Sequence, residues 1–304
     1  MFVTLPNPIT SSSSSCRVPF SDLRLLKVQG KLVYNTVRGM ICLGSRVNVG
    51  ICNPSTTQLH IFPQFKFKQV PKFYPRPEFF FGYDPVEDQY KVLAVDTTCY
   101  WRSEHKVVTS GMYMNGTLYY GASRKDTDSP KNSSIIMSFD VRLETFNIIK
   151  VPSILVPTGN EYMWKVDMWA RTDKTLINYR GKIGVVENPR QGSFRIWVVE
   201  DAEKEEWSVN TFHLPESAAG LDFKVMETFY TSEIVMVPTE LSDPVCLFYY
   251  NLDRKNMRSV TIEGLPVPEP KRAKELSVTV SDHCESFMFF ETSSFNLRLY
   301  IYRN

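Results

Sequence analysis

The stretch IMSFDVRLETFNIIKVP, residues Ile136–Pro152, contains a strand-like run, a polar turn at Asp140–Glu144, a second strand-like run and a closing proline. Asp and Asn side chains bond to nearby backbone groups and tolerate turn conformations, whereas proline lacks the N–H that a ladder needs and belongs at a strand end. The stretch therefore predicts a β-hairpin. Similar stretches, with Asn53, Asp201 and Asn251 at the turn, occur at Val49–Pro63, Ile196–Pro215 and Cys246–Pro266.

A second turn signal precedes each of these hairpins. RGMICLG (Arg38–Gly44), NGTLYYGA (Asn115–Ala122) and RGKIGVV (Arg180–Val186) each place Gly after a polar residue and before an apolar run, and Ser232 takes the Gly place in a weaker copy. Gly supplies the positive φ of a tight turn. Each unit then holds three or four strands, and units of about 40–50 residues with four strands are typical of propeller blades. The sequence predicts an all-β, propeller-like array of about five or six small antiparallel sheets, with one incomplete blade allowed.

One segment departs from this repeat. Phe79–Asp96 predicts a strand, a turn at Asp84-Pro85 and a long strand, without the opening glycine or the closing proline. The C-terminal runs Ser277–Asp282, Ser286–Thr292 and Phe295–Asn304 also read as strands. Because terminal strands can complete a shared blade and remove an exposed edge, we expect one of them to pair with the run before Arg38.

The composition indicates a globular protein without a strong electrostatic field. Of 304 residues, 43% are hydrophobic, and 35 Lys+Arg against 33 Asp+Glu give a net charge of +2. This balance favours neither nucleic acid nor an anionic membrane, and no apolar run reaches the ~18 residues of a membrane helix. The Ser-rich start lacks a signal-peptide pattern. We expect a flexible segment over residues 1–30 and one β domain over 31–304.

Cysteines and histidines give little sign of metal or redox chemistry. Cys42, Cys52 and Cys246 lie in apolar runs, and no C-x-x-C pair occurs, which predicts reduced core thiols and an intracellular location in the cytoplasm, the nucleus or both. No two of the four histidines have metal-ligand spacing. We expect no catalytic, cofactor or metal site, and we interpret the cluster His283-Cys284-Glu285 as part of a loop or strand end.

Other conspicuous stretches have structural explanations. The acidic run Glu200–Glu206 falls at a predicted turn and is expected to be solvated, and Phe79–Phe81 is expected to be a buried strand. Tyr119-Tyr120 and Tyr249-Tyr250 are each expected to place one ring in the core and the other outward, because neighbouring side chains of a strand point to opposite faces.

Six short segments occur in a characteristic order: GMICL with its following ICNPSTT, GYDPVEDQYKV, HKVVTSG, MNGTLYYGA, FDVRLETFNIIKVP, and the pair GKIGVV and IWVVEDAEKEEW. Together, over about residues 35–300, they resemble the plant F-box-associated domain. The resemblance implies a substrate-recognition module of an SCF-type ubiquitin ligase adaptor. The family generally has a further strand or two between Gly111 and Met112, so their absence looks like a deletion.

The first 35 residues do not resemble an F-box, so we expect no binding of a Skp-type subunit by this chain alone. Three functions stay open at this point. They are a module that binds an unidentified target protein, a truncated or vestigial product without a partner, and a propeller enzyme, which would need clustered carboxylates or metal ligands at a ring centre.

Binding residues of propellers lie on loops at the faces of the ring. The long predicted loops are Gln64–Pro77, Thr97–Glu104, Ser153–Met163 and Glu216–Leu221. Aromatic and arginine side chains dominate contact energy at interfaces, although these rings could instead tuck beneath their own loops. The candidate partner-binding residues are Phe73, Tyr74, Arg76, Tyr100, Trp101, Arg102 and Tyr162.

Overall fold

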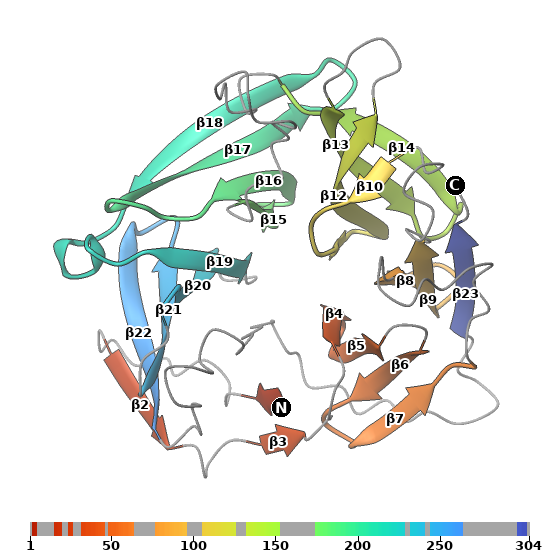
Figure 1. The fold of residues 1–304 in the computed structure, drawn as a ribbon, viewed down its shortest axis with the longest axis horizontal. Coiled ribbons are helices and arrows are strands. Elements are labelled where there is room, and N and C mark those ends of the chain that lie inside the picture. Colours follow the sequence, from red (N-terminus) through yellow and green to blue (C-terminus); the bar gives the residue numbers. More distant parts are fainter. Residues whose placement is uncertain are drawn as a thin grey trace. The chain divides into compact units, whose positions relative to one another are not determined.

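A computed structural model gives the fold (Figure 1). The residues that it describes are 2–4, 15–19, 24–26, 32–45, 48–63, 77–95, 105–125, 132–152, 174–228, 232–240, 244–263 and 297–302. These residues form strands and turns, with one short 3-10 helix, η3 (Glu216–Ala218). The all-β prediction is confirmed. None of the described residues form a helix long and apolar enough to span a membrane.

The chain divides into two compact units. Unit 1 comprises Met1–Gln29, Asp173–Val198 and Ser208–Asp282, and unit 2 comprises Gly30–Thr172, Val199–Trp207 and His283–Asn304. Each unit is assembled from segments that are distant in sequence, so neither corresponds to a continuous domain. The predicted division of the chain at residue 30 stays a prediction.

The described residues of unit 2 form three sheets. The first has the order β4 (Leu32–Val37), β5 (Met40–Ser45), β6 (Asn48–Asn53), β7 (Gln58–Ile61). The second has the order β8 (Glu78–Asp84), β9 (Gln89–Val95), β23 (Leu297–Tyr302). The third is built from β10 (His105–Val107), β11 (Met112–Met114), β12 (Thr117–Lys125), β13 (Asn132–Asp140) and β14 (Thr145–Lys150).

Unit 1 holds most of the remaining strands. One sheet has the order β15 (Lys174–Tyr179), β16 (Lys182–Glu187), β17 (Ser193–Asp201), β18 (Glu206–His213), and the tip of its last hairpin, Val199–Trp207, groups with unit 2. Another has the order β19 (Phe223–Thr228), β20 (Glu233–Pro238), β21 (Val245–Asn251), β22 (Asn256–Glu263), β2 (Ser15–Pro19). A two-stranded sheet joins β1 (Phe2–Thr4) to β3 (Arg24–Leu26).

The four predicted hairpins form, each around an Asp or Asn side chain that caps its own turn. Asp140 accepts hydrogen bonds from the backbone N–H groups of Arg142 (2.8 Å) and Leu143 (2.7 Å). Asp201 and Asn251 accept the same pair of bonds, and Asp84 does so in the β8–β9 hairpin. Asn53 accepts one bond of this kind, from the N–H of Ser55. The last turn residue has a positive φ in all five hairpins: Thr57, Asp88, Glu144, Glu205 and Lys255. We call these five the Asx turns.

The predicted glycine turns also form. Arg38-Gly39, Asn115-Gly116 and Arg180-Gly181 have positive φ at both central residues, with φ of 49° and 78° in the first pair. This is the type I′ pattern whose twist suits a two-residue hairpin. Ser232, at the weaker copy, also has a positive φ of 59°.

Two sheets are completed by strands from the chain ends, in parallel. β23 pairs with β9 over Leu297–Tyr302, and β2 pairs with β22 over Ser15–Pro19. The expected pairing of a C-terminal strand with the run before Arg38 does not occur for β23. The other two C-terminal runs, Ser277–Asp282 and Ser286–Thr292, lie outside the described residues, so for them the pairing stays a prediction. The run before Arg38 contains β3, which pairs with β1, and β4, whose described neighbour is β5 across the Arg38-Gly39 turn. The sheets are mixed rather than purely antiparallel at these two edges.

The place of the apparent deletion is bridged by a divided strand. β10 and β11 both pair with β12, at Ala122–Arg124 and Thr117–Tyr119 respectively. Between them Gly111 lies against the Phe80 ring, where an added Cβ would be 2.3 Å from Cδ1. The segment before Met112 therefore lies close to the neighbouring sheet, and two short strands take the place of one continuous strand.

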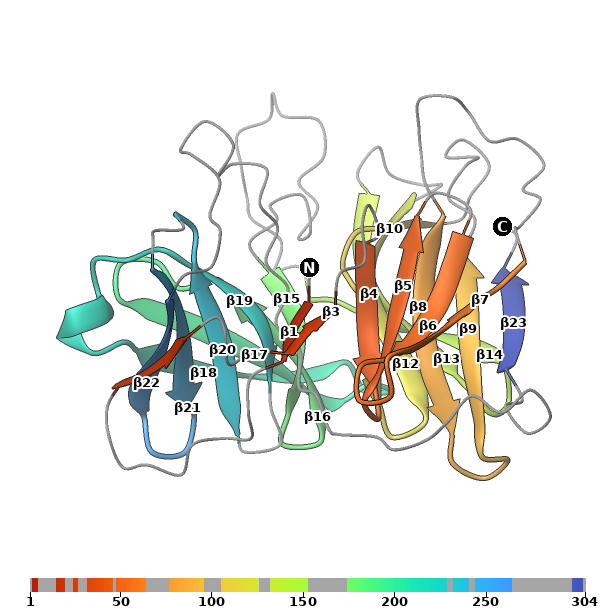
Figure 2. The ribbon, with the colours of Figure 1, turned by 90° about the horizontal axis from the view of Figure 1, so that it is seen from below.

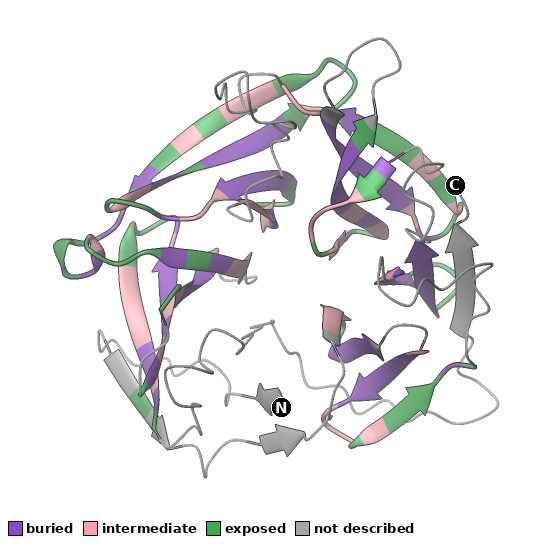
Figure 3. Ribbon diagram, in the orientation of Figure 1, coloured by how far each residue is buried: buried purple, intermediate pink, exposed green. Residues whose placement is uncertain are grey.

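Three apolar clusters lie among the described residues. In unit 2, one face of the β8–β9 hairpin packs on β4–β6 and the other on β12–β13. In unit 1, the β15–β18 and β19–β22 sheets share a cluster around Phe194, Phe212, Phe223 and Tyr250. Figure 3 shows that exposed residues gather on β7, β14 and β18, which end their sheets among the described strands.

Candidate protein-binding face

The Asx and glycine turns of unit 2 gather at one end of its sheets. In an antiparallel sheet the turn after the first strand and the turn after the third lie at the same end, and Figure 2 shows these turns at the lower end of the strands of unit 2. Hydrogen bonding confirms this arrangement, because the Val141 N–H donates to the Gly116 carbonyl at 2.9 Å. We call this surface the turn face of unit 2. It comprises Arg38-Gly39, Pro54–Thr57, Pro85–Asp88, Asn115-Gly116 and Val141–Glu144.

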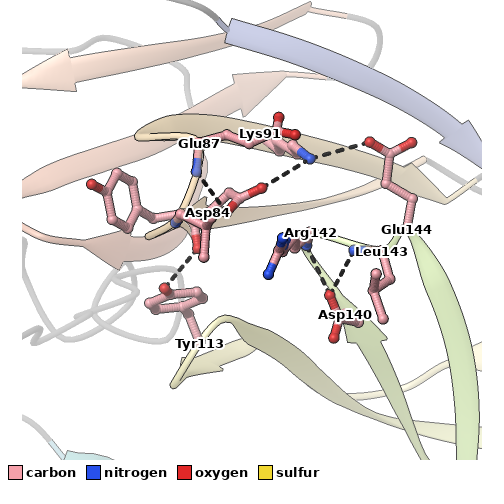
Figure 4. Close-up of polar contacts among 10 residues, drawn as sticks. Asp84, Glu87, Lys91, Tyr113, Asp140, Arg142, Leu143 and Glu144 are labelled. Carbon is pink, nitrogen blue, oxygen red and sulfur yellow. Dashed lines mark hydrogen bonds and ion pairs between the residues drawn. The ribbon is translucent and has the colours of Figure 1, made fainter.

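Aromatic side chains tie the turns of different sheets together. The Arg38 guanidinium lies 4.1 Å from the centre of the Tyr83 ring, and the Tyr83 hydroxyl donates to the Asp88 carboxylate. Tyr113, from β11, donates its hydroxyl to the Tyr83 carbonyl at 2.7 Å (Figure 4). Burial and the hydrogen bond to Asp88 raise the pKa of Tyr83, and burial raises that of Tyr90 to about 12. Both phenols therefore stay neutral at physiological pH.

A buried ammonium group connects two neighbouring Asx turns. Lys91 Nζ lies 3.5 Å from Asp84 Oδ2 and 3.1 Å from Glu144 Oε1 (Figure 4). The Lys91 and Asp84 side chains are 2% and 0% exposed. Burial alone would raise the pKa of Asp84, but the N–H groups of Glu87 and Val86 and the charge of Lys91 outweigh it and lower that pKa. The two turns are therefore held at a fixed separation by a charged contact.

Two aliphatic side chains project from this braced surface. Val86 is 63% exposed and Leu143 is 67% exposed, each on the turn of a different sheet. A single exposed aliphatic residue needs no explanation. These two, however, occupy turns that Lys91 and the Gly116–Val141 hydrogen bond hold in place. The arrangement presents two apolar side chains on a rigid support, which suits contact with another protein.

Residues 1–284 match the sequence model of a protein family, the F-box associated beta propeller domain. The chain belongs to this family. Membership as a β-propeller domain agrees with the succession of small sheets built from repeated hairpins.

Relatives of this F-box associated β-propeller domain carry names of F-box proteins. One from Arabidopsis thaliana is 54% identical over 296 residues, covering 96% of this chain and 79% of the relative. A second F-box protein of that plant is 30% identical over 287 residues, covering 82% of this chain and 66% of the relative. The chain therefore spans about two thirds to four fifths of the length of these relatives.

Solved structures add little to this assignment. A family 117 glycoside hydrolase of Zobellia galactanivorans is 10% identical, with a TM-score of 0.34, over 77% of this chain and 59% of that chain. A likeness of this size supports no argument about function.

All seven partner-binding residues predicted for the F-box associated domain lie outside the described residues, and so does the cluster His283-Cys284-Glu285. Of the four predicted binding loops, only Glu216–Leu221 is described in full, where η3 is followed by Leu221, which is 41% exposed. The seven candidates stay predictions.

Other sequence predictions can be compared with the described residues. Phe79–Phe81, Cys42 and Cys52 are buried as expected, whereas Cys246 is only partly buried. The acidic turn Ala202–Glu206 is exposed, as expected. One prediction is wrong, because Tyr249 and Tyr250 are both buried. The Arg258 guanidinium covers the Tyr249 ring at 4.0 Å and is itself held by both carboxylate oxygens of Glu233. Tyr249 shares its face of the sheet with Val235, Leu247 and Val260, which are also buried, so both faces of this sheet are covered and alternation exposes neither tyrosine.

The sequence did not point to Val86, Lys91, Leu143 or Glu144 as site residues. A signal was present for Lys91, a lone charge within the apolar run QYKVLAV. A buried lysine needs a counter-charge, and Asp84 of the preceding turn was available. Within the described residues, no group of three His, Cys, Asp or Glu side chains is placed to hold a metal ion.

Proposed function

We propose that this chain is a target-recognition module of the F-box adaptor type, which binds a protein through the turn face of unit 2. The observation that carries the proposal is the pair of exposed aliphatic tips, Val86 and Leu143, on turns braced by Lys91. Family membership supports a role in target recognition, and the geometry supports this particular surface.

Rigidity is the physical reason for choosing this surface. A surface that is already ordered loses little conformational entropy on binding, so more of the contact energy appears as affinity. Full burial of an exposed Val or Leu side chain contributes about 1.5–3 kcal/mol through the removal of apolar surface from water. Val86 and Leu143 have the exposure to act as apolar anchors, and Arg142 between the Asp140 cap and Leu143 offers a charged group for the rim.

Quantitative affinity capture tests the proposal. The tagged chain, its Val86→Asp/Leu143→Asp variant and an Ile148→Asp control are used as baits in an extract of Arabidopsis thaliana. Ile148 is a suitable control because it is an exposed aliphatic residue (45%) of the same unit that lies on the outer strand β14. All three proteins should have melting temperatures within a few degrees.

We expect the double variant to capture at least tenfold less of each protein that the unaltered chain enriches. The Ile148→Asp control should capture these proteins in undiminished amounts. Equal capture by all three baits would contradict the turn face as the binding surface. Enrichment no greater than that of the tag alone would contradict the binding function itself.

The seven aromatic and arginine residues predicted from the sequence are a second proposed surface, and Tyr100→Ala/Trp101→Ala tests it in the same assay. The expectation that this chain alone does not bind a Skp-type subunit stays a prediction. Titration with the purified subunit checks it, and sub-micromolar affinity would contradict it.

A further inference from the structure

The β8–β9 hairpin is buried on both faces. Phe79, Phe81 and Val92 face the cluster formed with β4–β6, whereas Phe80 and Leu93 face the cluster formed with β12 and β13. Every residue of β9 from Tyr90 to Val95 is buried. The hairpin therefore forms the central layer of the described part of unit 2. Only two strands of this layer, β8 and β9, are consecutive in the chain.

The edge of this hairpin on the β8 side is covered by fixed side chains. Asn35 Nδ2 donates to the Phe81 carbonyl (2.6 Å), and the Phe81 N–H donates to Asn35 Oδ1 (2.9 Å). Tyr113 bonds to the Tyr83 carbonyl of the same strand. A register shift between Val33 and Thr36 in β4 directs Asn35 to this position. These groups belong to strands that are themselves packed into unit 2.

The β9 edge is covered differently, by a strand that arrives from the far end of the chain. β23 pairs with β9 in parallel without a break, from Leu297 opposite Tyr90 to Tyr302 opposite Val95. About 30 residues separate the end of β22 at Glu263 from Leu297, and a chain of that length can reach ~100 Å when extended. The connection therefore does not force β23 onto β9.

We propose that the outer edge of β9 is a strand-acceptor site, and that β23 occupies it as a tethered ligand which the same segment can replace in trans. The two faces and the β8 edge are held by the rest of unit 2, so the acceptor strand is formed before β23 arrives. Main-chain hydrogen bonds then supply the affinity, as in other cases of strand addition. The occupant is the C-terminal segment of this chain, its own or that of a second copy.

The same arrangement occurs in unit 1. There β2, from the N-terminal part of the chain, pairs in parallel with β22, which like β9 is the second strand of an Asx hairpin. Arg17 of β2 and Glu263 of β22 form an exposed ion pair at 3.3 Å. Addition of a distant parallel strand to this type of hairpin is thus a recurrent feature of the described chain.

A cleavable chain tests the proposal without requiring a truncated protein to fold. A protease site is inserted between Ser293 and Ser294, so that only the β23 segment is released, and the full chain is purified folded and then cut. The probe is a fluorescent peptide with the sequence Phe295–Asn304. A control peptide carries proline at positions 299 and 300, which removes a ladder N–H whichever strand residue donates.

We expect the cut fragment to stay bound and to be displaced by the probe peptide at micromolar to millimolar concentration. Dilution and removal of the fragment should lower the melting temperature by roughly 5 °C or more, and added probe should restore it. The proline peptide should bind the cut chain at least tenfold more weakly than the probe does. The uncut chain should also bind the probe at least tenfold more weakly than the cut chain does.

Two results would overturn the proposal. One is a cut chain that keeps its melting temperature after losing the fragment and does not bind the probe. The other is equal binding of the probe and the proline peptide, because strand addition depends on the ladder hydrogen bonds.

Discussion

Replacing Lys91 with methionine should lower the free energy of unfolding by about 3 kcal/mol, because it leaves the buried Asp84 carboxylate facing an uncharged side chain. Removing one member of a buried ion pair costs about 3–5 kcal/mol. We take the lower end, since Glu144 is 31% exposed and two backbone N–H groups continue to solvate Asp84. In a chain of 304 residues the loss corresponds to a fall in melting temperature of roughly 5 °C, because the entropy of unfolding is about 2.1 cal/mol/K per residue.

Urea unfolding and thermal melts at pH 7 measure this loss, with Lys150→Met as the matched control. Lys150 also forms an ion pair, with Glu205 at 2.6 Å, but it is 72% exposed. An exposed pair contributes ~1 kcal/mol or less, so the control should be nearly neutral. A Lys91→Met variant as stable as the Lys150→Met control would refute the assignment of Lys91 as a buried ionic support.

The pH dependence gives the Lys91 prediction a second readout. The folded pKa of Asp84 is lowered, so its stabilisation is present above the unfolded value near ~4 and is lost as the pH falls through the folded value. The difference between the unaltered chain and Lys91→Met should therefore be full at pH 7 and should narrow below about pH 4. Adding Asp84→Asn to the Lys91→Met variant should recover part of the lost free energy of unfolding, since Asn53 and Asn251 cap the same kind of turn without a charge.

Three further predictions concern turns and one ion pair. Gly181→Ala should lower the free energy of unfolding by about 1 kcal/mol because Gly181 has a positive φ of 81°, whereas Gly220→Ala should be nearly neutral, although an added Cβ meets open space at both sites. Equal losses for the two variants in chemical unfolding would contradict the turn assignment. Asp140→Ala should cost about 1 kcal/mol through loss of two turn hydrogen bonds, whereas Asp140→Asn should retain most of the stability; thermal melts compare the two variants. Arg258→Met should lower the free energy of unfolding, measured with urea, by roughly 1 kcal/mol more than Arg195→Met does. The reason is that Arg258 makes two hydrogen bonds to Glu233 and covers Tyr249, while Arg195 is half-exposed. Equal losses would show that the ion pair with Glu233 adds no stability.

Local structure was predictable from the sequence because its causes are local. Asp140 caps a turn through backbone groups two and three residues away, and Gly116 takes a positive φ whatever lies around it. The same residue types recur at the other turns. Hairpin positions and the all-β class therefore followed from short stretches, and so did the expectation of a propeller-like array.

Contacts between distant residues were not predictable in this way. Glu144 meets Lys91 across 53 sequence positions, and β23 meets β9 in parallel from the opposite end of the chain. Neither pairing leaves a periodic pattern in the sequence. Tyr249 is buried because both faces of its sheet are covered, which alternation along one strand cannot reveal.

Site-specific photo-crosslinking tests the central claim most directly, namely that the turn face of unit 2 contacts a target protein. A benzophenone amino acid is placed singly at Leu143, at Ile148 and at Trp101, and each protein is irradiated in plant extract. The claim predicts a discrete covalent adduct with one protein at Leu143 and none at Ile148. An adduct confined to Trp101, or equal adducts at Leu143 and Ile148, would contradict it.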